Sequence, residues 1–201
     1  MSEFSCCYHL KSESIDDCIR LIRKAHVTGF VFPARENWVS FVVNEPDFIF
    51  SKKLIEANDG ILLNFINAED HGWSFEIFSQ KTRLCKFECT YSGDEEVADY
   101  CDFNESSFDD IDDFSRYFPC IYSHEKCVDN WDGMFSKDQL YVLDSAFRMN
   151  NKTPPMERIT ANDFASGIGL YFYDWVSYNY ISFDPPTSYG EYSKLKIINV
   201  K

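Results

Sequence analysis

Alternation between apolar and polar side chains constrains the fold of this chain more than any other feature. Trp73, Phe75 and Ile77 are separated by Ser74 and Glu76. From residue 85 to residue 91, two cysteines, a phenylalanine and a tyrosine alternate with Lys, Glu and Thr. Successive side chains of a β-strand point to opposite faces, so this pattern indicates strands with one buried face. It predicts an antiparallel sheet over residues 73–79 and 84–91.

The rest of residues 1–93 predicts three more strands and two helices. Apolar residues at three- and four-residue steps follow Ser14, which favours a helix from Ser14 to Ala25. A second, short helix is expected over 51–58. The further strands are 29–32, 38–43 and 61–67, the first two joined as a hairpin. We therefore expect an α+β fold, with an antiparallel sheet of about five strands and helices packed on one side.

The C-terminal half is expected to be mostly helical. Ser136 and Gln139 match a capping box for a helix to about Met149, and Thr160 with Asp163 is typical of the start of another. The aromatic run 171–181 is interpreted as a buried helix, with a strand as the alternative. Residues 195–200 are expected to form a closing edge strand.

Acidic residues are concentrated in one part of the sequence. The 201 residues carry a formal net charge of -14, and the block 94–113 contributes ten acidic residues and neither Lys nor Arg. The other 181 residues hold 23 acidic and 19 basic side chains. We expect one compact domain over 1–201. The alternative is an α+β half (1–93), an acidic connector (94–113) and a helix-rich half (114–201).

Composition also limits the partners and the compartment. An acidic surface repels phosphate backbones and anionic lipid headgroups, so we expect no binding to nucleic acid or membranes. The N-terminal residues lack the features of a secretory signal, and no stretch approaches 18 apolar residues. A cytoplasmic location is therefore expected, with most of the eight cysteines reduced.

Two groups of residues are candidates for chemistry. Glu69, Asp70 and His71 lie at a turn between two predicted strands, where ionisable groups exchange protons or bind a metal. The alternative is a structural turn with Gly72. Cys120, His124 and Cys127 are possible zinc ligands, which need further ligands to complete a tetrahedron. Cys85 or Cys89, or the group Cys6, Cys7 and His9, could supply them. The alternative is a loop with ordinary thiols and no cofactor.

The uneven charge favours an interaction protein that binds a basic protein partner. The expected contact residues are Asp109, Asp110, Asp112 and Asp113, with Tyr100, Phe103 and Phe108 as apolar anchors. In composition the chain is similar to small bacterial immunity proteins, which neutralise toxins. The alternative function is a hydrolase-like or metal-dependent enzyme centred on Glu69, Asp70 and His71. Common nucleophile, phosphate-binding and zinc-protease motifs are absent from the sequence.

Overall fold

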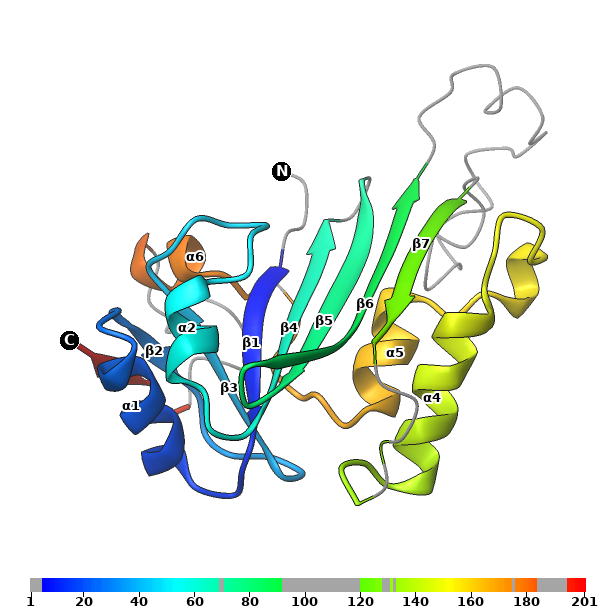
Figure 1. Cartoon of the computed structure of the whole chain (residues 1–201). Helices are drawn as coiled ribbons and strands as arrows, with labels where there is room; N and C mark the ends of the chain where they lie inside the picture. Colours follow the sequence, from blue (N-terminus) through cyan, green and yellow to red (C-terminus); the bar gives the residue numbers. More distant parts are fainter. Residues whose placement is uncertain are drawn as a thin grey trace.

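One antiparallel sheet of eight strands runs through the described part of the molecule (Figure 1). In this computed structural model, residues 5–68, 71–91, 120–127, 131, 133–174, 176–183 and 195–201 are described. The strands follow the order β7-β6-β5-β4-β1-β3-β2-β8. Their bounds are β1 (Ser5–Lys11), β2 (Gly29–Val31), β3 (Trp38–Val43), β4 (Ile61–Ala68), β5 (Gly72–Ser79), β6 (Thr82–Tyr91), β7 (Cys120–Lys126) and β8 (Ile198–Val200).

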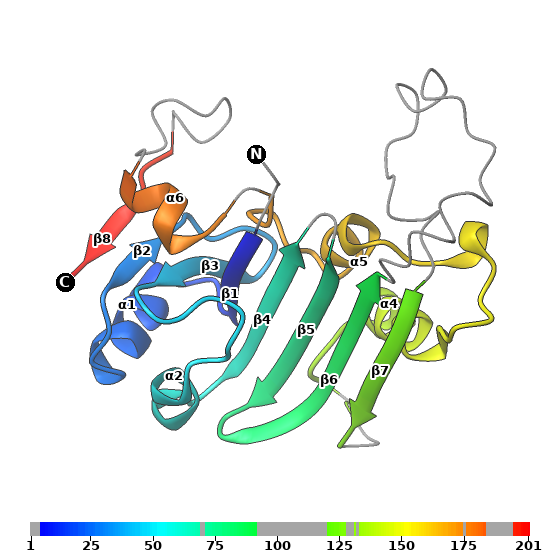
Figure 2. The same cartoon turned by 90° about the horizontal axis from the view of Figure 1, so that it is seen from above.

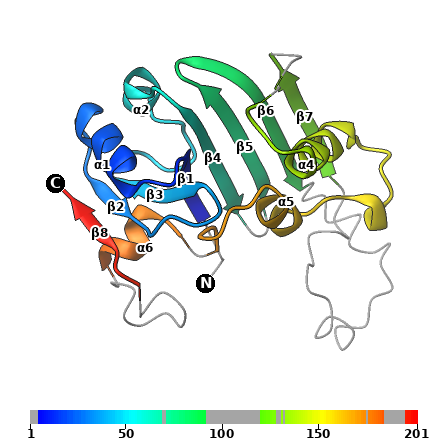
Figure 3. The same ribbon diagram turned by 90° about the horizontal axis from the view of Figure 1, so that it is seen from below.

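Helices cover both faces of this sheet. The helices α1 (Ile15–Lys24) and α2 (Lys52–Ala57) lie on one face (Figure 3). The helices α4 (Lys137–Arg148), α5 (Ala161–Gly167) and α6 (Tyr178–Phe183) lie on the opposite face. A short 3-10 helix, η3 (Pro155–Glu157), connects α4 to α5. Seen from above, α4 and α5 cover the half of the sheet that contains β5, β6 and β7 (Figure 2).

Two hydrophobic cores follow from this arrangement, because alternate residues of each central strand face opposite layers. Tyr8, Leu10 and Phe41 belong to the core beneath α1 and α2. The larger core lies against α4 and α5, where aromatic rings stack. The ring centroid of Phe75 lies 4.1 Å from that of Phe164 and 5.2 Å from that of Phe87. Packed aromatic rings bury large apolar areas, which makes this layer a main source of stability.

Most of the expected helices and strands are confirmed. The hairpin of β2 and β3, the strands β4 to β6, the helices α1 and α2, and the edge strand β8 lie where the sequence predicts them. Both capping boxes are present. Ser136 accepts from the backbone N–H of Gln139 at the start of α4, and Thr160 accepts from that of Asp163 at the start of α5. Local hydrogen-bonding side chains therefore set these helix starts.

The expected sheet of about five strands with helices on one side is wrong. The sheet has eight strands and helices on both faces. Strand β1, which the sequence pattern does not predict, lies in the middle of the sheet between β3 and β4. Six of its seven residues are buried, so both faces are covered and the strand shows no polar alternation. Strand β7 is not predicted either, because its residues from Ile121 onward are mainly exposed and polar.

The expectation of a mostly helical C-terminal half is also wrong. Among its described residues, this half contributes two strands to the sheet, and helix α6 takes up only the end of the aromatic run 171–181. Before α6, the described residues 171–174 and 176–177 form no helix, and Phe172 and Val176 are buried. The carbonyl of Val176 accepts a hydrogen bond from the N–H of Cys6 over 2.9 Å. The central strand β1 thereby satisfies a backbone group that would otherwise be buried without a partner.

The strands on either side of the acidic block are neighbours in the sheet. Tyr91, the last residue of β6, pairs with Cys120, the first residue of β7. The segment 92–119, which includes the acidic block, lies outside the described residues. It leaves and rejoins the sheet at one end of a β-hairpin, hereafter the β6–β7 end. Of the helices in the described ranges, none combines the length and apolar character needed to cross a lipid bilayer.

Candidate functional site

The predicted catalytic turn lies between β4 and β5, and only part of it is described. Glu69 and Asp70 are outside the described residues, and His71 is exposed. The N–H of His71 donates to the carbonyl of Ala68 over 2.6 Å, and its own carbonyl accepts from the N–H of Tyr91 over 3.2 Å. Both bonds are made by the backbone of His71. They are the bonds expected of a turn that joins two strands of a sheet.

Gly72 explains why the chain turns at this point. Its φ of +117° lies in a region that glycine tolerates and other residues rarely adopt. A Cβ atom at this position would lie 2.0 Å from the carbonyl oxygen of Cys89 in β6. The close approach of two backbones therefore requires glycine here. These observations explain why glycine occupies position 72 in this turn.

The three predicted zinc ligands are spread along β7 and the residue that follows it. Cys120 begins β7 and is buried, whereas His124 and Cys127 are exposed. Cys120 and His124 are four residues apart on a strand, which separates their backbones by about 13 Å. The ring of His124 packs edge-on against Phe147, with centroids 5.9 Å apart. Across the described ranges, no group of three His, Cys, Asp or Glu side chains is placed to hold a metal ion.

A polar cluster surrounds the sulfur of Cys120 at the β6–β7 end. Nη1 of Arg158 donates to Sγ of Cys120 over 3.3 Å. The side chains of Cys89 and Tyr122 also form hydrogen bonds with this thiol. Cys89 lies opposite Tyr122 in the ladder. This pair is two residues along the strands from the pair Tyr91–Cys120 and therefore faces the same side of the sheet. Three side chains from β6, β7 and the segment after η3 therefore meet at one sulfur atom.

Backbone contacts hold Arg158 in this position. Its Nε donates to the carbonyl of Thr153 over 3.1 Å, which fixes the orientation of the guanidinium group. In the same segment, Oδ1 of Asn151 accepts from the N–H of Tyr122 over 3.3 Å, which attaches the segment to β7. The chain between α4 and α5 therefore lies along β7. Its folding brings a cation to Cys120 from 38 residues further along the sequence.

The cluster shifts the ionisation of both cysteines, in opposite directions. Hydrogen bonds from Cys89 and Tyr122 and the positive charge of Arg158 lower the pKa of Cys120, although burial opposes this effect. The hydrogen bond to Cys120 raises the pKa of Cys89, and burial adds to this effect. Burial and the neighbouring thiols also raise the pKa of Tyr122. One thiol of the pair is thus biased toward the thiolate form, and the other stays protonated.

A second group of potentially reactive side chains is buried within the sheet. Nε2 of His9 lies 3.1 Å from Sγ of Cys7, and its Nδ1 lies 2.8 Å from Oγ of Ser40. These three residue types resemble a nucleophile with its base. However, His9 and Cys7 have no exposed surface. Burial lowers the pKa of His9 to about 3 and raises that of Cys7, so both stay neutral. Cys7, His9 and Ser40 therefore form a polar network within the core, in which buried polar groups hydrogen-bond to one another.

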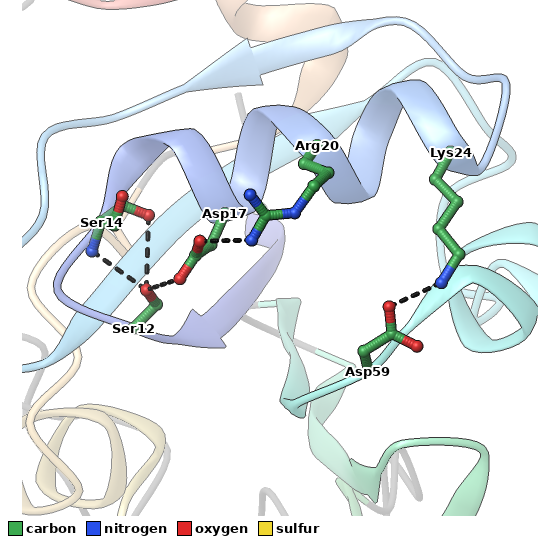
Figure 4. Close-up of polar contacts among 6 residues, drawn as sticks. All are labelled: Ser12, Ser14, Asp17, Arg20, Lys24 and Asp59. Atoms are coloured by element: carbon green, nitrogen blue, oxygen red, sulfur yellow. Dashed lines mark hydrogen bonds and ion pairs between the residues drawn. The ribbon is translucent and has the colours of Figure 1, made fainter.

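A polar cavity of about 210 Å³ lies between α1 and the segment 57–60. Figure 4 shows two ion pairs at this place. Nη2 of Arg20 lies 2.5 Å from Oδ1 of Asp17, and Nζ of Lys24 lies 2.6 Å from Oδ2 of Asp59. Asp17 also accepts a hydrogen bond from Ser12 over 2.7 Å. Each cation is therefore matched by a carboxylate. Arg20 and Asp17 both belong to α1, whereas the pair of Lys24 and Asp59 joins α1 to the segment after α2. Ion pairs as exposed as these contribute little to stability.

The strands β5 to β7 also present a polar face. It lies on the side of the sheet that α1 and α2 cover elsewhere, and no described helix packs on it (Figure 3). The guanidinium of Arg83 bridges two carboxylates: Nη1 lies 3.7 Å from Oε2 of Glu76, and Nη2 lies 2.5 Å from Oε2 of Glu125. Nζ of Lys86 lies 3.6 Å from Oε2 of Glu88. Ile121 is 55% exposed on this face, next to the β6–β7 end.

The remaining predicted site residues lie outside the described part of the chain. They are the contact residues Tyr100, Phe103, Phe108, Asp109, Asp110, Asp112 and Asp113. The sequence pattern predicts Cys120 as a possible metal ligand and gives no sign of the polar cluster around its sulfur. Arg158 carries no local signal that connects it with Cys120. Comparisons with known proteins add no further assignment, since no family model, curated protein or solved structure matches the chain.

Proposed function

We propose that the chain is a non-enzymatic interaction protein that binds a basic protein partner at the β6–β7 end. The observation that carries this proposal is the pairing of Tyr91 with Cys120. This pairing fixes both ends of the segment that contains the acidic block at one place on the sheet. Ten carboxylates without a Lys or Arg among them are thereby attached to a scaffold whose own charges are nearly balanced.

The surface next to this attachment suits a docking role. Ile121 and Thr90 are partners in the ladder, and both are exposed on the face without a described helix. Glu88 and Ser123 form the next pair of partners on that face. An apolar side chain within a polar surface provides short-range contact that charge alone lacks. Long-range attraction of a basic partner by the acidic block and short-range packing on Ile121 would act together.

The physical basis of the proposed binding is electrostatic steering. Clustered charge of one sign accelerates encounter with an oppositely charged surface, and a Debye length of about 8 Å at physiological salt limits its range. The association rate constant is therefore expected to fall by at least tenfold between 50 and 500 mM NaCl. Contacts made by Ile121 affect mainly the dissociation rate.

The test uses the full chain, immobilised in lysate of the source organism at low salt, with captured proteins identified by mass spectrometry. Partner binding is then measured by calorimetry with the purified partner. Changing Asp109, Asp110, Asp112 and Asp113 to Lys should weaken binding by at least a hundredfold. A matched control changes four exposed acids elsewhere to Lys: Glu13, Glu36, Glu56 and Glu157. The control has the same net charge and should retain most of the affinity.

Two results would overturn the proposal. The first is that both fourfold variants weaken binding equally, which would show dependence on total charge alone. The second is that the captured partner is acidic. His71→Ala separates the proposal from the enzymatic alternative, because an interaction protein should keep its affinity after this change. If His71→Ala instead abolishes a measured hydrolytic or metal-dependent activity, the alternative centred on Glu69, Asp70 and His71 is favoured.

A further inference from the structure

The sulfur of Cys120 lies where Arg158, Cys89 and Tyr122 converge, and this arrangement has a chemical consequence. Hydrogen bonds and a nearby guanidinium stabilise a thiolate, which is the nucleophilic form of cysteine. We propose that Cys120 is a modification site, oxidised by small peroxides to a sulfenic acid that the thiol of Cys89 converts to a disulfide. This inference concerns a different chemistry from the proposed function and does not depend on it.

Cys120 differs from the other described cysteines in its surroundings. Cys7, Cys18 and Cys85 are completely buried, and burial raises the pKa of each. A buried neutral thiol is a poor nucleophile. Cys127 is exposed, and it donates to a carboxylate oxygen of Glu125 over 3.4 Å. The guanidinium of Arg83 also forms a hydrogen bond with Cys127. Cys120 differs because hydrogen bonds to Cys89 and Tyr122 join the guanidinium of Arg158 at its sulfur.

The oxidation balances as follows. The thiolate of Cys120 attacks one oxygen of hydrogen peroxide, a sulfur–oxygen bond forms and the oxygen–oxygen bond breaks. Hydroxide leaves and takes a proton from solvent to become water. Cys120 is thereby oxidised by two electrons to the sulfenic acid, and the peroxide is reduced. In the second step, the sulfur of Cys89 attacks that of Cys120, and the sulfenic oxygen leaves as water with the proton of Cys89.

The role of Cys89 follows from its hydrogen bond to Cys120. This bond is the largest cause of the raised pKa of Cys89, and it keeps the thiol protonated while Cys120 is anionic. When Cys120 becomes a neutral sulfenic acid, that cause disappears and Cys89 becomes easier to deprotonate. The two residues lie on the same face of adjacent strands, since Cys89 pairs with Tyr122, two residues after Cys120. Cys89 is therefore the nearest described thiol for the second step.

Access to the site limits the size of the oxidant. Cys120 is 6% exposed and Cys89 is 2% exposed. Hydrogen peroxide and iodoacetamide are small enough to reach a largely covered sulfur, whereas aromatic disulfide reagents are bulky. Exposed Cys127 should react with both kinds of reagent. The ratio of Cys120 to Cys127 labelling should therefore fall at least tenfold when an aromatic disulfide replaces iodoacetamide.

The first experiment measures alkylation of the full chain by brief pulses of iodoacetamide from pH 5 to pH 9. Trypsin cleaves after Lys126, so Cys120 and Cys127 are quantified on separate peptides. Half-maximal labelling of Cys120 is expected at least one pH unit below the value of about 8.5 for a free thiol. Arg158→Met should move this midpoint up by about one unit, and Arg158→Lys should move it less. Arg148→Met, which removes an exposed arginine, is the matched control.

The wild-type profile decides the first step even if a variant fails to fold. A midpoint for Cys120 at or above pH 8.5 would overturn the proposal. Circular dichroism of each variant shows whether a shift reflects unfolding. If Arg158→Met is folded and leaves the midpoint unchanged, Arg158 does not stabilise the thiolate and the proposed basis of reactivity is wrong.

The second experiment treats the full chain with hydrogen peroxide and then with dimedone, which traps sulfenic acids. Wild type should give a Cys89–Cys120 disulfide that dithiothreitol reverses. Cys89→Ser should instead give dimedone-labelled Cys120. Cys101 shares a tryptic peptide with Cys89, so Cys101→Ser is the matched control and should still form the disulfide. Cross-linking that requires Cys101, or oxidation of Cys127 faster than Cys120, would overturn the proposal.

Discussion

Tyr91 and Cys120 are direct partners in the ladder between β6 and β7, although the segment 92–119 separates them in the sequence. Six further residue pairs continue this ladder from Thr90 and Ile121 to Cys85 and Lys126. The register between the two strands is therefore defined along the whole length of β7. The long connection adds a cost in loop-closure entropy that these pairs must offset.

The first prediction concerns removal of the acidic block. Replacement of residues 94–113 by a four-residue Gly-Ser linker should leave the fold intact, because β6 and β7 are held by their own pairing. The shorter connection should raise the free energy of unfolding by up to about 1 kcal/mol. Urea denaturation followed by tryptophan fluorescence measures this change. The folded variant should no longer bind the partner. If the variant is unfolded instead, the block is needed for folding and the prediction is wrong.

The second prediction concerns the pH dependence of stability through His9. Its pKa is lowered from 6.5 to about 3 in the folded protein because the ring is fully buried. Above pH 6.5, His9 is neutral in both states and contributes no pH dependence. Between pH 6.5 and pH 3, the unfolded chain binds a proton that the folded chain does not, so stability falls. The loss attributable to His9 from pH 7 to pH 5 is roughly 2 kcal/mol.

Urea denaturation at pH 7 and pH 5 tests this dependence. His9→Gln should be less stable than wild type at pH 7, since it disrupts the contacts with Cys7 and Ser40. The difference between its stabilities at the two pH values should nevertheless be smaller than in wild type by roughly 2 kcal/mol. His124→Gln, which replaces an exposed histidine, is the matched control. Equal pH dependence in wild type and His9→Gln would contradict a buried neutral His9.

The third prediction separates two reasons for a glycine. Gly72 and Gly133 both have positive φ angles, of +117° and +75°. A Cβ at Gly72 would lie 2.0 Å from a backbone oxygen, whereas a Cβ at Gly133 would meet nothing within 4 Å. Gly133→Ala should therefore cost about 1 kcal/mol for its backbone conformation alone. Gly72→Ala should cost at least about 2 kcal/mol more, because β5 and β6 must separate to admit the methyl group.

Thermal and urea denaturation of both glycine variants measure this difference. Similar losses at the two positions would mean that the close approach of β5 and β6 relaxes easily. In that case Gly72 would be required for its φ angle rather than for strand packing.

The sequence predicted elements whose signals are local. The alternation in β5 and β6 gave their positions because each strand has one covered face and one polar face. The capping boxes at Ser136 and Thr160 gave the starts of α4 and α5 because they involve residues three apart. The aromatic run 171–181 was interpreted wrongly, since residues such as Phe172 are buried by the sheet and need no helical period of their own.

By itself the sequence determined the local structure and the charge distribution: the helix starts, the alternating strands and the acidic block between residues 94 and 113. Only the tertiary structure decided that β1 lies inside the sheet, that helices cover both faces, and that Arg158 reaches Cys120. The physical reason is the range of the interactions. Side chains three or four residues apart are coupled by the backbone between them. Contacts across a sheet depend on how distant segments share one core, which no local pattern specifies.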